Sequence, residues 1–164
     1  MAQADRDLPE VYVQPGESHL ATEPAILRTV LGSCVGIAFL VPRLGIGVLC
    51  HPMLPVCPQN LAAERSLAAG RRYVDFAIRD VASQFDTRGA RRSEVRVKLF
   101  GGADVLLAAT ATSRPTVGRL NCEAALRELH GHGFEVVASS LGGTAGISLQ
   151  FNTATGEVLL RRLT

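Results

Sequence analysis

The sequence predicts a single α+β domain in which mixed or antiparallel β-sheets form a sandwich-like core, with two main helices packed on one side. The chain has 164 residues, of which 47% are hydrophobic, and about 100 to 200 residues is the usual size of one domain with its own core. Strand-like and helix-like stretches follow one another with short, hairpin-like links. That order favours an α+β domain over a doubly wound parallel sheet.

The first 25 residues are mostly polar and contain three prolines. We therefore treat residues 1–25 as an N-terminal segment and residues 26–164 as the main domain. Within the segment, Val11–Val13 is a candidate for a short edge strand, because prolines nearby are tolerated at a sheet edge.

Three strands are predicted in the first third of the domain. Residues 25–40 are rich in Ile, Leu and Val but are interrupted by Gly32, Ser33 and Cys34, which predicts two strands that meet at a tight turn. The turn-forming sequence 42–45 precedes a third apolar run, which we expect to end near His51.

One long helix is predicted over residues 61–85, where apolar residues recur at helical spacing. Asn60 is a plausible N-cap for it, and Gly70 is a weak point inside it.

A second, shorter helix is predicted to begin at Asn121 as its N-cap and to end near Gly131 and Gly133. The Thr-rich, Ala-rich stretch 108–118 before it is expected to be a surface loop. The remaining strands are expected at 95–99, 134–139, 147–151 and 158–163, the last two as a hairpin.

Charge and composition narrow the classes of function. With 17 basic and 15 acidic residues the net charge is +2, so we expect no nucleic-acid or anionic-membrane binding. The longest apolar stretches fall short of the roughly 20 residues that span a bilayer, and the N-terminus lacks the apolar region of a secretory signal. We expect a cytoplasmic protein that is not membrane-embedded, whose four cysteines are reduced.

Cys34 is the first candidate for chemistry, because Gly32 and Ser33 leave room for a substrate carbonyl beside its thiol. A cysteine nucleophile needs a partner that holds it as a thiolate, such as an imidazolium. His51 follows 17 positions later, and two antiparallel strands joined by the turn at 42–45 would bring the two residues near each other. On composition alone, a cysteine in an apolar strand is more often a small core residue.

Metal binding is the competing interpretation, with Cys50, His51 and Cys57 as a cluster and Cys34 as a fourth ligand. The spacing lacks the paired pattern of structural zinc sites, and adjacent residues of a strand point to opposite faces. The glycine-rich stretches at 100–103 and 141–146 match neither the P-loop nor the dinucleotide-binding fingerprint. We therefore expect no metal and no organic cofactor.

Several motifs, in order, resemble those of the chemoreceptor glutamine deamidase family, CheD. The motifs are LGSCVG at 31–36, HPMLP at 51–55, KLFGGA at 98–103 and LGGTAGISLQFNTATGEVLLRRL at 141–163. Further similarity at 72–78 and 136–143 extends the match over nearly the whole chain from Leu27 onward.

The resemblance implies that Cys34 is the catalytic nucleophile and His51 its base. The family also uses a threonine six positions before the cysteine, where this chain has Arg28; Thr29 is one position nearer and is the expected equivalent. Family members often carry Gly-Arg-Lys where this chain has Gly146, Ile147 and Ser148, which removes any partner contact made by those basic side chains.

The implied reaction is hydrolysis of a glutamine side-chain amide to glutamate through a thioester on the cysteine. The implied substrate is the cytoplasmic helical bundle of a methyl-accepting chemoreceptor, and a CheC-type phosphatase is an implied partner. The same chemistry could hydrolyse a glutamate methyl ester. The alternative is a non-catalytic adaptor of the same fold that binds a chemoreceptor or such a phosphatase.

Overall fold

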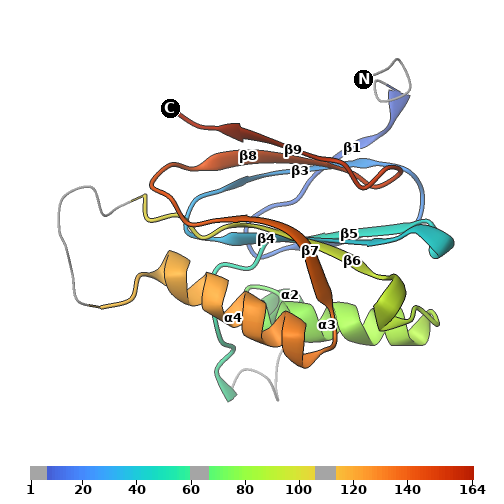
Figure 1. The fold of residues 1–164 in the computed structure, drawn as a ribbon, viewed down its shortest axis with the longest axis horizontal. Coiled ribbons are helices and arrows are strands. Elements are labelled where there is room, and N and C mark those ends of the chain that lie inside the picture. Colours follow the sequence, from blue (N-terminus) through green and yellow to red (C-terminus); the bar gives the residue numbers. More distant parts are fainter. Residues whose placement is uncertain (1–6, 60–66, 106–113) are drawn as a thin grey trace.

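A computed structural model describes residues 7–59, 67–105 and 114–164, which form two stacked β-sheets with helices on one side (Figure 1). The four-stranded sheet contains, in spatial order, β1 (Glu10–Tyr12), β3 (Ile26–Leu31), β8 (Ile147–Asn152) and β9 (Val158–Arg162). The five-stranded sheet contains β2 (Ser18–Ala21), β5 (Ile46–Cys50), β4 (Val35–Val41), β6 (Arg96–Gly101) and β7 (Glu135–Leu141). The predicted α+β class is confirmed.

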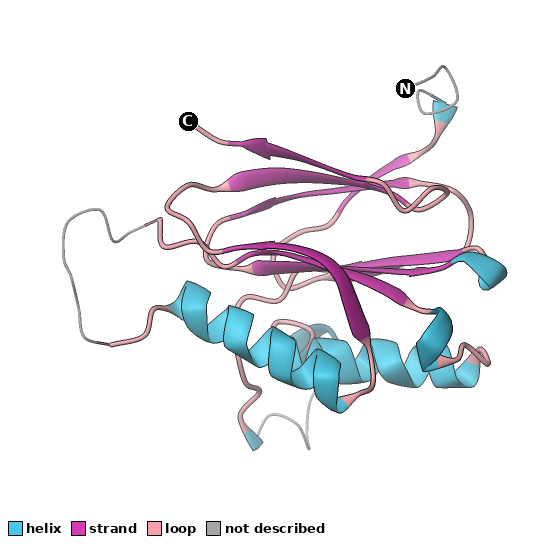
Figure 2. Cartoon of the chain, in the orientation of Figure 1, coloured by secondary structure: helices cyan, strands magenta, loops and turns pink. Residues whose placement is uncertain are grey.

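The helices of the described ranges lie on the outer face of the five-stranded sheet (Figure 2). They are α2 (Leu67–Gly70), α3 (Val74–Thr87) and α4 (Val117–Gly131). Short 3-10 turns are η2 (Pro42–Leu44), which connects β4 to β5, and η3 (Arg92–Glu94), which precedes β6. Phe39 of β4 meets Phe85 and Phe134 edge-to-face beneath these helices, with ring centroids 5.8 and 5.4 Å away. The packing of two main helices on one side is confirmed. No helix of the described ranges is long and apolar enough to cross a bilayer.

A second apolar core lies between the two sheets. Strand β4 contributes to both cores because successive side chains point to opposite faces: Ile37 and Phe39 pack under the helices, whereas Ala38 and Leu40 face the other sheet. All seven residues of β4 are buried, which explains its uninterrupted apolar sequence.

The predicted tight turn at Gly32–Cys34 joins strands of different sheets. Strand β3 pairs with β8, and β4 pairs with β5 and β6. The three small residues therefore take the chain from one layer of the sandwich to the other. The strand before His51 and the C-terminal hairpin of β8 and β9 are also confirmed.

The N-terminal segment supplies an edge strand to each sheet. Strand β1 pairs in parallel with β3, which confirms the predicted edge strand. Strand β2 pairs antiparallel with β5 and was not predicted, because its four residues, SHLA, carry no clear alternation of apolar and polar side chains.

The continuous helix predicted over 61–85 is wrong, because α2 ends at Gly70 and α3 starts only at Val74. Between the two helices, the Arg72 carbonyl accepts hydrogen bonds from the backbone N–H groups of Met53 and Leu54 (2.7 and 3.1 Å) instead of from a helical N–H. Gly70 is the predicted weak point, and the ring of Phe76 occupies the space that a side chain there would need. Asn60, the predicted N-cap, and residues 61–66 lie outside the described residues.

The predicted start of the second helix is also wrong. Helix α4 begins at Val117, and its N-cap is Thr116, whose hydroxyl oxygen accepts a hydrogen bond from the Arg119 N–H (3.1 Å). Val117 and Gly118 are therefore helical rather than part of the predicted loop 108–118, of which residues 108–113 lie outside the described residues. Asn121 lies about one turn inside the helix and is fully buried.

Candidate active site

Cys34 and His51 lie at the same end of the paired strands β4 and β5. Ile37 is opposite Cys50 in this antiparallel pair, so one step further along the register His51 is opposite Gly36, two residues after Cys34. Opposite residues and residues two apart share a face of a sheet. Both side chains therefore lie on the face toward the four-stranded sheet, where Cys34 packs against the inter-sheet core. The predicted approach of the two strands is confirmed.

The His51 ring is buried against β3 and hydrogen-bonded there to Thr29. His51 and Thr29 are each only 1% exposed, and 2.6 Å separates His51 Nδ1 from Thr29 Oγ1. The Thr29 hydroxyl donates its single proton to the carbonyl of Val13, at 2.7 Å. It must therefore accept the bond from His51, so a neutral His51 carries its proton on Nδ1 and leaves Nε2 as an acceptor.

Burial makes the neutral forms of both groups the stable ones. Desolvation lowers the pKa of His51 to about 4, although the Val13 carbonyl acts in the opposite direction. Desolvation raises the pKa of the Cys34 thiol above its ordinary value, and a hydrogen bond from Cys34's own backbone N–H offsets part of this effect. The resting site therefore holds a thiol and an imidazole, not the thiolate and imidazolium pair expected from the sequence.

The backbone of the Cys34 turn is held at three successive carbonyls. The Gly32 and Cys34 carbonyls accept hydrogen bonds from the N–H groups of Ala103 (2.9 Å) and Gly102 (2.8 Å). The Ser33 carbonyl accepts one from the side-chain amide of Asn121 (2.9 Å). A methyl group on Gly101, the residue before these donors, would overlap the Cys34 carbonyl, so this glycine allows the two backbones to approach.

The N-terminal segment holds the backbone of His51. The His51 N–H donates to the Glu17 carbonyl at 2.9 Å, and its carbonyl accepts from the Gly16 N–H at 2.7 Å. Together with the bond from Thr29 to Val13, these contacts make the segment part of the site. The sequence carried no signal for this role.

Comparison with known proteins places the chain in a family. Residues 53–162 match the CheD family, described as CheD chemotactic sensory transduction. The chain is 44% identical over 156 residues to "Probable chemoreceptor glutamine deamidase CheD 2" of Geobacter sulfurreducens, which covers 95% of this chain and 91% of that one. The chain belongs to the CheD family. The resemblance found in the sequence motifs is thus confirmed.

Further similarities extend over most of the chain. "Probable chemoreceptor glutamine deamidase CheD" of Maridesulfovibrio salexigens is 35% identical over 167 residues, covering 99% of this chain and 97% of that one. Among solved structures, YlmD from Geobacillus stearothermophilus is similar with a TM-score of 0.49 and 14% identity, over 77% of this chain and 50% of that chain.

The other cysteines of this CheD-family chain lie in different surroundings. Cys50 points into the core under the helices, opposite to its neighbour His51, and burial raises its pKa to about 12. Cys57 is buried and Cys122 is half-buried, and all four cysteines are free. Because Cys50 and His51 face opposite ways, they do not form the metal cluster considered from the sequence.

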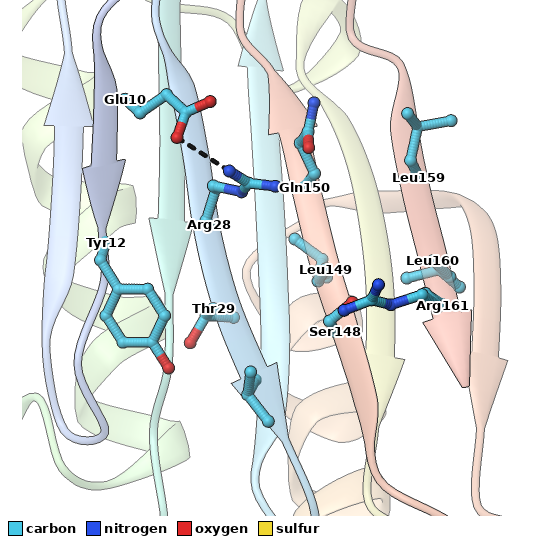
Figure 3. Close-up of a pocket in the computed structure, with 11 residues that line it drawn as sticks. Glu10, Tyr12, Arg28, Thr29, Ser148, Leu149, Gln150, Leu159, Leu160 and Arg161 are labelled. Carbon is cyan, nitrogen blue, oxygen red and sulfur yellow. Dashed lines mark hydrogen bonds and ion pairs between the residues drawn. The ribbon is translucent and has the colours of Figure 1, made fainter. Parts of the chain in front are cut away.

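A hollow lies on the outer face of the four-stranded sheet (Figure 3). It has a volume of about 650 Å³, contains the ion pair between Arg28 and Glu10 (2.8 Å), and is not lined by Cys34 or His51. Arg28 points outward here, whereas its neighbour Thr29 points inward to His51. Ser148 also lines this hollow.

The lowered pKa of His51 predicts a pH dependence of stability. The pKa is about 4 in the folded protein and about 6.5 in the unfolded chain. Between these values the unfolded chain binds a proton that the folded protein does not, so the free energy of unfolding decreases as pH falls. At pH 5 the free energy of unfolding should be lower than at pH 8 by about 2 kcal/mol because of this histidine alone. Urea unfolding of the wild type and His51→Gln between pH 8 and 5 measures it.

The wild type should lose this stability relative to His51→Gln, because other titrating groups cancel in the difference. Equal losses in both proteins would contradict the buried, neutral histidine.

Proposed function

We propose that this protein is a protein-glutamine deamidase that converts specific glutamine side chains of methyl-accepting chemoreceptors to glutamate. The observation that carries the proposal is the buried hydrogen bond between Thr29 and His51, on the sheet face that the strand register also gives to Cys34, in a chain of the CheD family. A nucleophile, a base and a third residue that orients the base form the usual set for covalent hydrolysis. The relatives named above as chemoreceptor glutamine deamidases support the choice of substrate.

The first half of the reaction forms a thioester. Cys34 Sγ attacks the carbon of the glutamine carboxamide while His51 Nε2 accepts the thiol proton, so that charge develops only as the new bond forms. The Cys34 backbone N–H donates to the oxygen of the tetrahedral intermediate, a contribution of about 3 to 4 kcal/mol for a good donor. His51 then donates this proton to the amide nitrogen, and the intermediate collapses to the thioester as ammonia leaves.

The second half releases glutamate. Neutral His51 accepts a proton from water, the hydroxide attacks the thioester carbon, and the Cys34 sulfur leaves and is reprotonated by His51. Thr29 keeps the imidazole in the tautomer that this requires. The scheme uses side chains, backbone and water, and it would also hydrolyse a glutamate methyl ester.

The substrate glutamine enters beside the Cys34 turn. A hollow of about 170 Å³ adjoins it, lined by Ser33 and by residues 103–105 and 116–118. Val105 and Val117 at its rim are 41% and 45% exposed, and exposed apolar side chains of this kind suit the surface of a protein helix. We assign the catalytic residues to the domain 26–164, with Val13 of the N-terminal segment as a support.

Family membership also supports the setting of the reaction. We propose that the protein acts in the cytoplasm, on the cytoplasmic helices of the receptor, and that a CheC-type phosphatase is its regulatory partner. Replacing a neutral amide by a carboxylate changes the repulsion between neighbouring receptor helices, which gives the reaction a signalling effect.

Cys34→Ala should abolish deamidation because it removes the nucleophile. The purified protein is incubated with a folded receptor cytoplasmic fragment, and ammonia release and the mass of each glutamine peptide are measured. Cys122→Ala, which removes another half-buried thiol, is the matched control and should retain activity.

Undiminished activity of Cys34→Ala would rule out this nucleophile. Absence of deamidation by the wild type, with the fragment folded and bound, would instead favour the adaptor.

Thr29→Val should lower kcat on the order of 10²-fold with little change in KM, because a misoriented base slows the chemistry more than binding. Valine keeps the shape of threonine but can neither accept from His51 nor donate to Val13. Thr29→Ser keeps the hydroxyl and should retain most of the rate. Equal kcat values for the valine and serine variants would show that the hydrogen bond does not orient the base.

A further inference from the structure

Asn121 links the segment that carries Cys34 to the segment that carries His51. Its side-chain nitrogen Nδ2 donates one proton to the Ser33 carbonyl at 2.9 Å and the other to the Met53 carbonyl at 3.0 Å. Asn121 lies on α4 and is 0% exposed, so both bonds are shielded from water. One amide group therefore fixes the two segments relative to each other.

The bond to Ser33 sets the direction of the Cys34 N–H. The Ser33 carbonyl and the Cys34 N–H belong to one peptide unit, which is planar and trans, so the two groups point in opposite directions. Holding the carbonyl on Asn121 therefore aims the N–H away from α4. The neighbouring carbonyls of Gly32 and Cys34 are held by backbone N–H groups, so among these three Ser33 is the one held by a side chain.

The bond to Met53 acts on the base. Met53 is two residues after His51, and its own N–H donates to the Arg72 carbonyl at 2.7 Å. The Met53 carbonyl accepts the second hydrogen bond from Asn121, so both polar backbone groups of Met53 are held. The backbone on the C-terminal side of His51 thus has the same anchor as the turn that carries the nucleophile.

Oδ1 of Asn121 is buried and has no hydrogen-bond partner among the described residues. A buried acceptor without a partner is destabilising, and most such groups in native proteins are paired. The two donated bonds are thus the feature that distinguishes Asn121 from an apolar residue of similar size.

We propose that Asn121 is a positioning residue of the deamidase site, which aligns the Cys34 N–H and sulfur with the ring of His51. This rests on the function proposed above. Its action is indirect, through the Ser33 and Met53 carbonyls, because its own side chain contacts backbone rather than the reacting groups.

The test compares Asn121→Leu and Asn121→Ala with the control Ala125→Gly. Ala125 is buried one turn further along α4, in the core under the helices, so its replacement destabilises the same helix without removing either bond. With the receptor fragment as substrate, both Asn121 variants should lose kcat by about 10²-fold at nearly unchanged KM. Ala125→Gly should keep its kcat at a comparable loss of Tm.

Two results with an active wild type would overturn the proposal. One is a kcat of the folded Asn121 variants within twofold of the wild type. The other is an equal loss of kcat in Ala125→Gly at the same Tm, which would mean that general destabilisation explains the effect.

An activity-independent measurement separates this inference from the proposed function. If the wild type itself deamidates no glutamine, the proposed function fails, and NMR titration of the His51 ring tests the positioning role alone. Releasing Met53 should admit water to His51 and raise its pKa toward the ordinary value in Asn121→Leu but not in Ala125→Gly. An unchanged pKa would contradict the role of Asn121.

If neither Asn121 variant folds, hydrogen exchange of the Asn121 side-chain amide in the wild type tests whether the two bonds are held. Both Nδ2 protons of Asn121 should then exchange as slowly as amides of the buried strands. Exchange at the rate of an exposed asparagine side chain would overturn the proposal.

Discussion

The hydrogen bond between Thr29 and His51 is the interaction on which the site depends. The two residues belong to different sheets, so they meet only because the sheets stack with β3 facing the end of β5. The Val13 carbonyl accepts the hydrogen bond from the threonine hydroxyl, so the hydroxyl oxygen must accept the bond from His51. The inter-sheet core, the N-terminal segment and the imidazole tautomer are thus linked through one hydroxyl group.

Burial of this hydroxyl and ring has a chemical consequence. A buried imidazole with a pKa of about 4 stays neutral at physiological pH, which suits a group that must accept a proton from an uncharged thiol. The Cys34 thiol is protonated at rest for the same reason, because desolvation disfavours its charged form. In the proposed mechanism, nucleophilic charge then appears only when a substrate carbonyl is in place.

Local patterns predicted the parts of the site that lie along paired strands. The apolar runs and the turn at 42–45 were enough to place Cys34 and His51 at one end of two adjacent strands. The contact between Thr29 and His51 crosses between sheets, and no local pattern specifies how two sheets stack. Asn121 was mistaken for a helix cap because asparagine before an apolar stretch is a common capping signal, whereas its role depends on two carbonyls distant in the sequence.

Interception of the thioester by hydroxylamine tests the central claim most directly. If Cys34 forms a thioester with the substrate, hydroxylamine added during turnover should attack its carbonyl carbon, displace the thiol and leave a glutamyl hydroxamate at the target positions of the receptor fragment. Peptide mass spectrometry detects this product, which should be absent with Cys34→Ala. Formation of glutamate alone, at every hydroxylamine concentration and with an active enzyme, would contradict a covalent intermediate on Cys34.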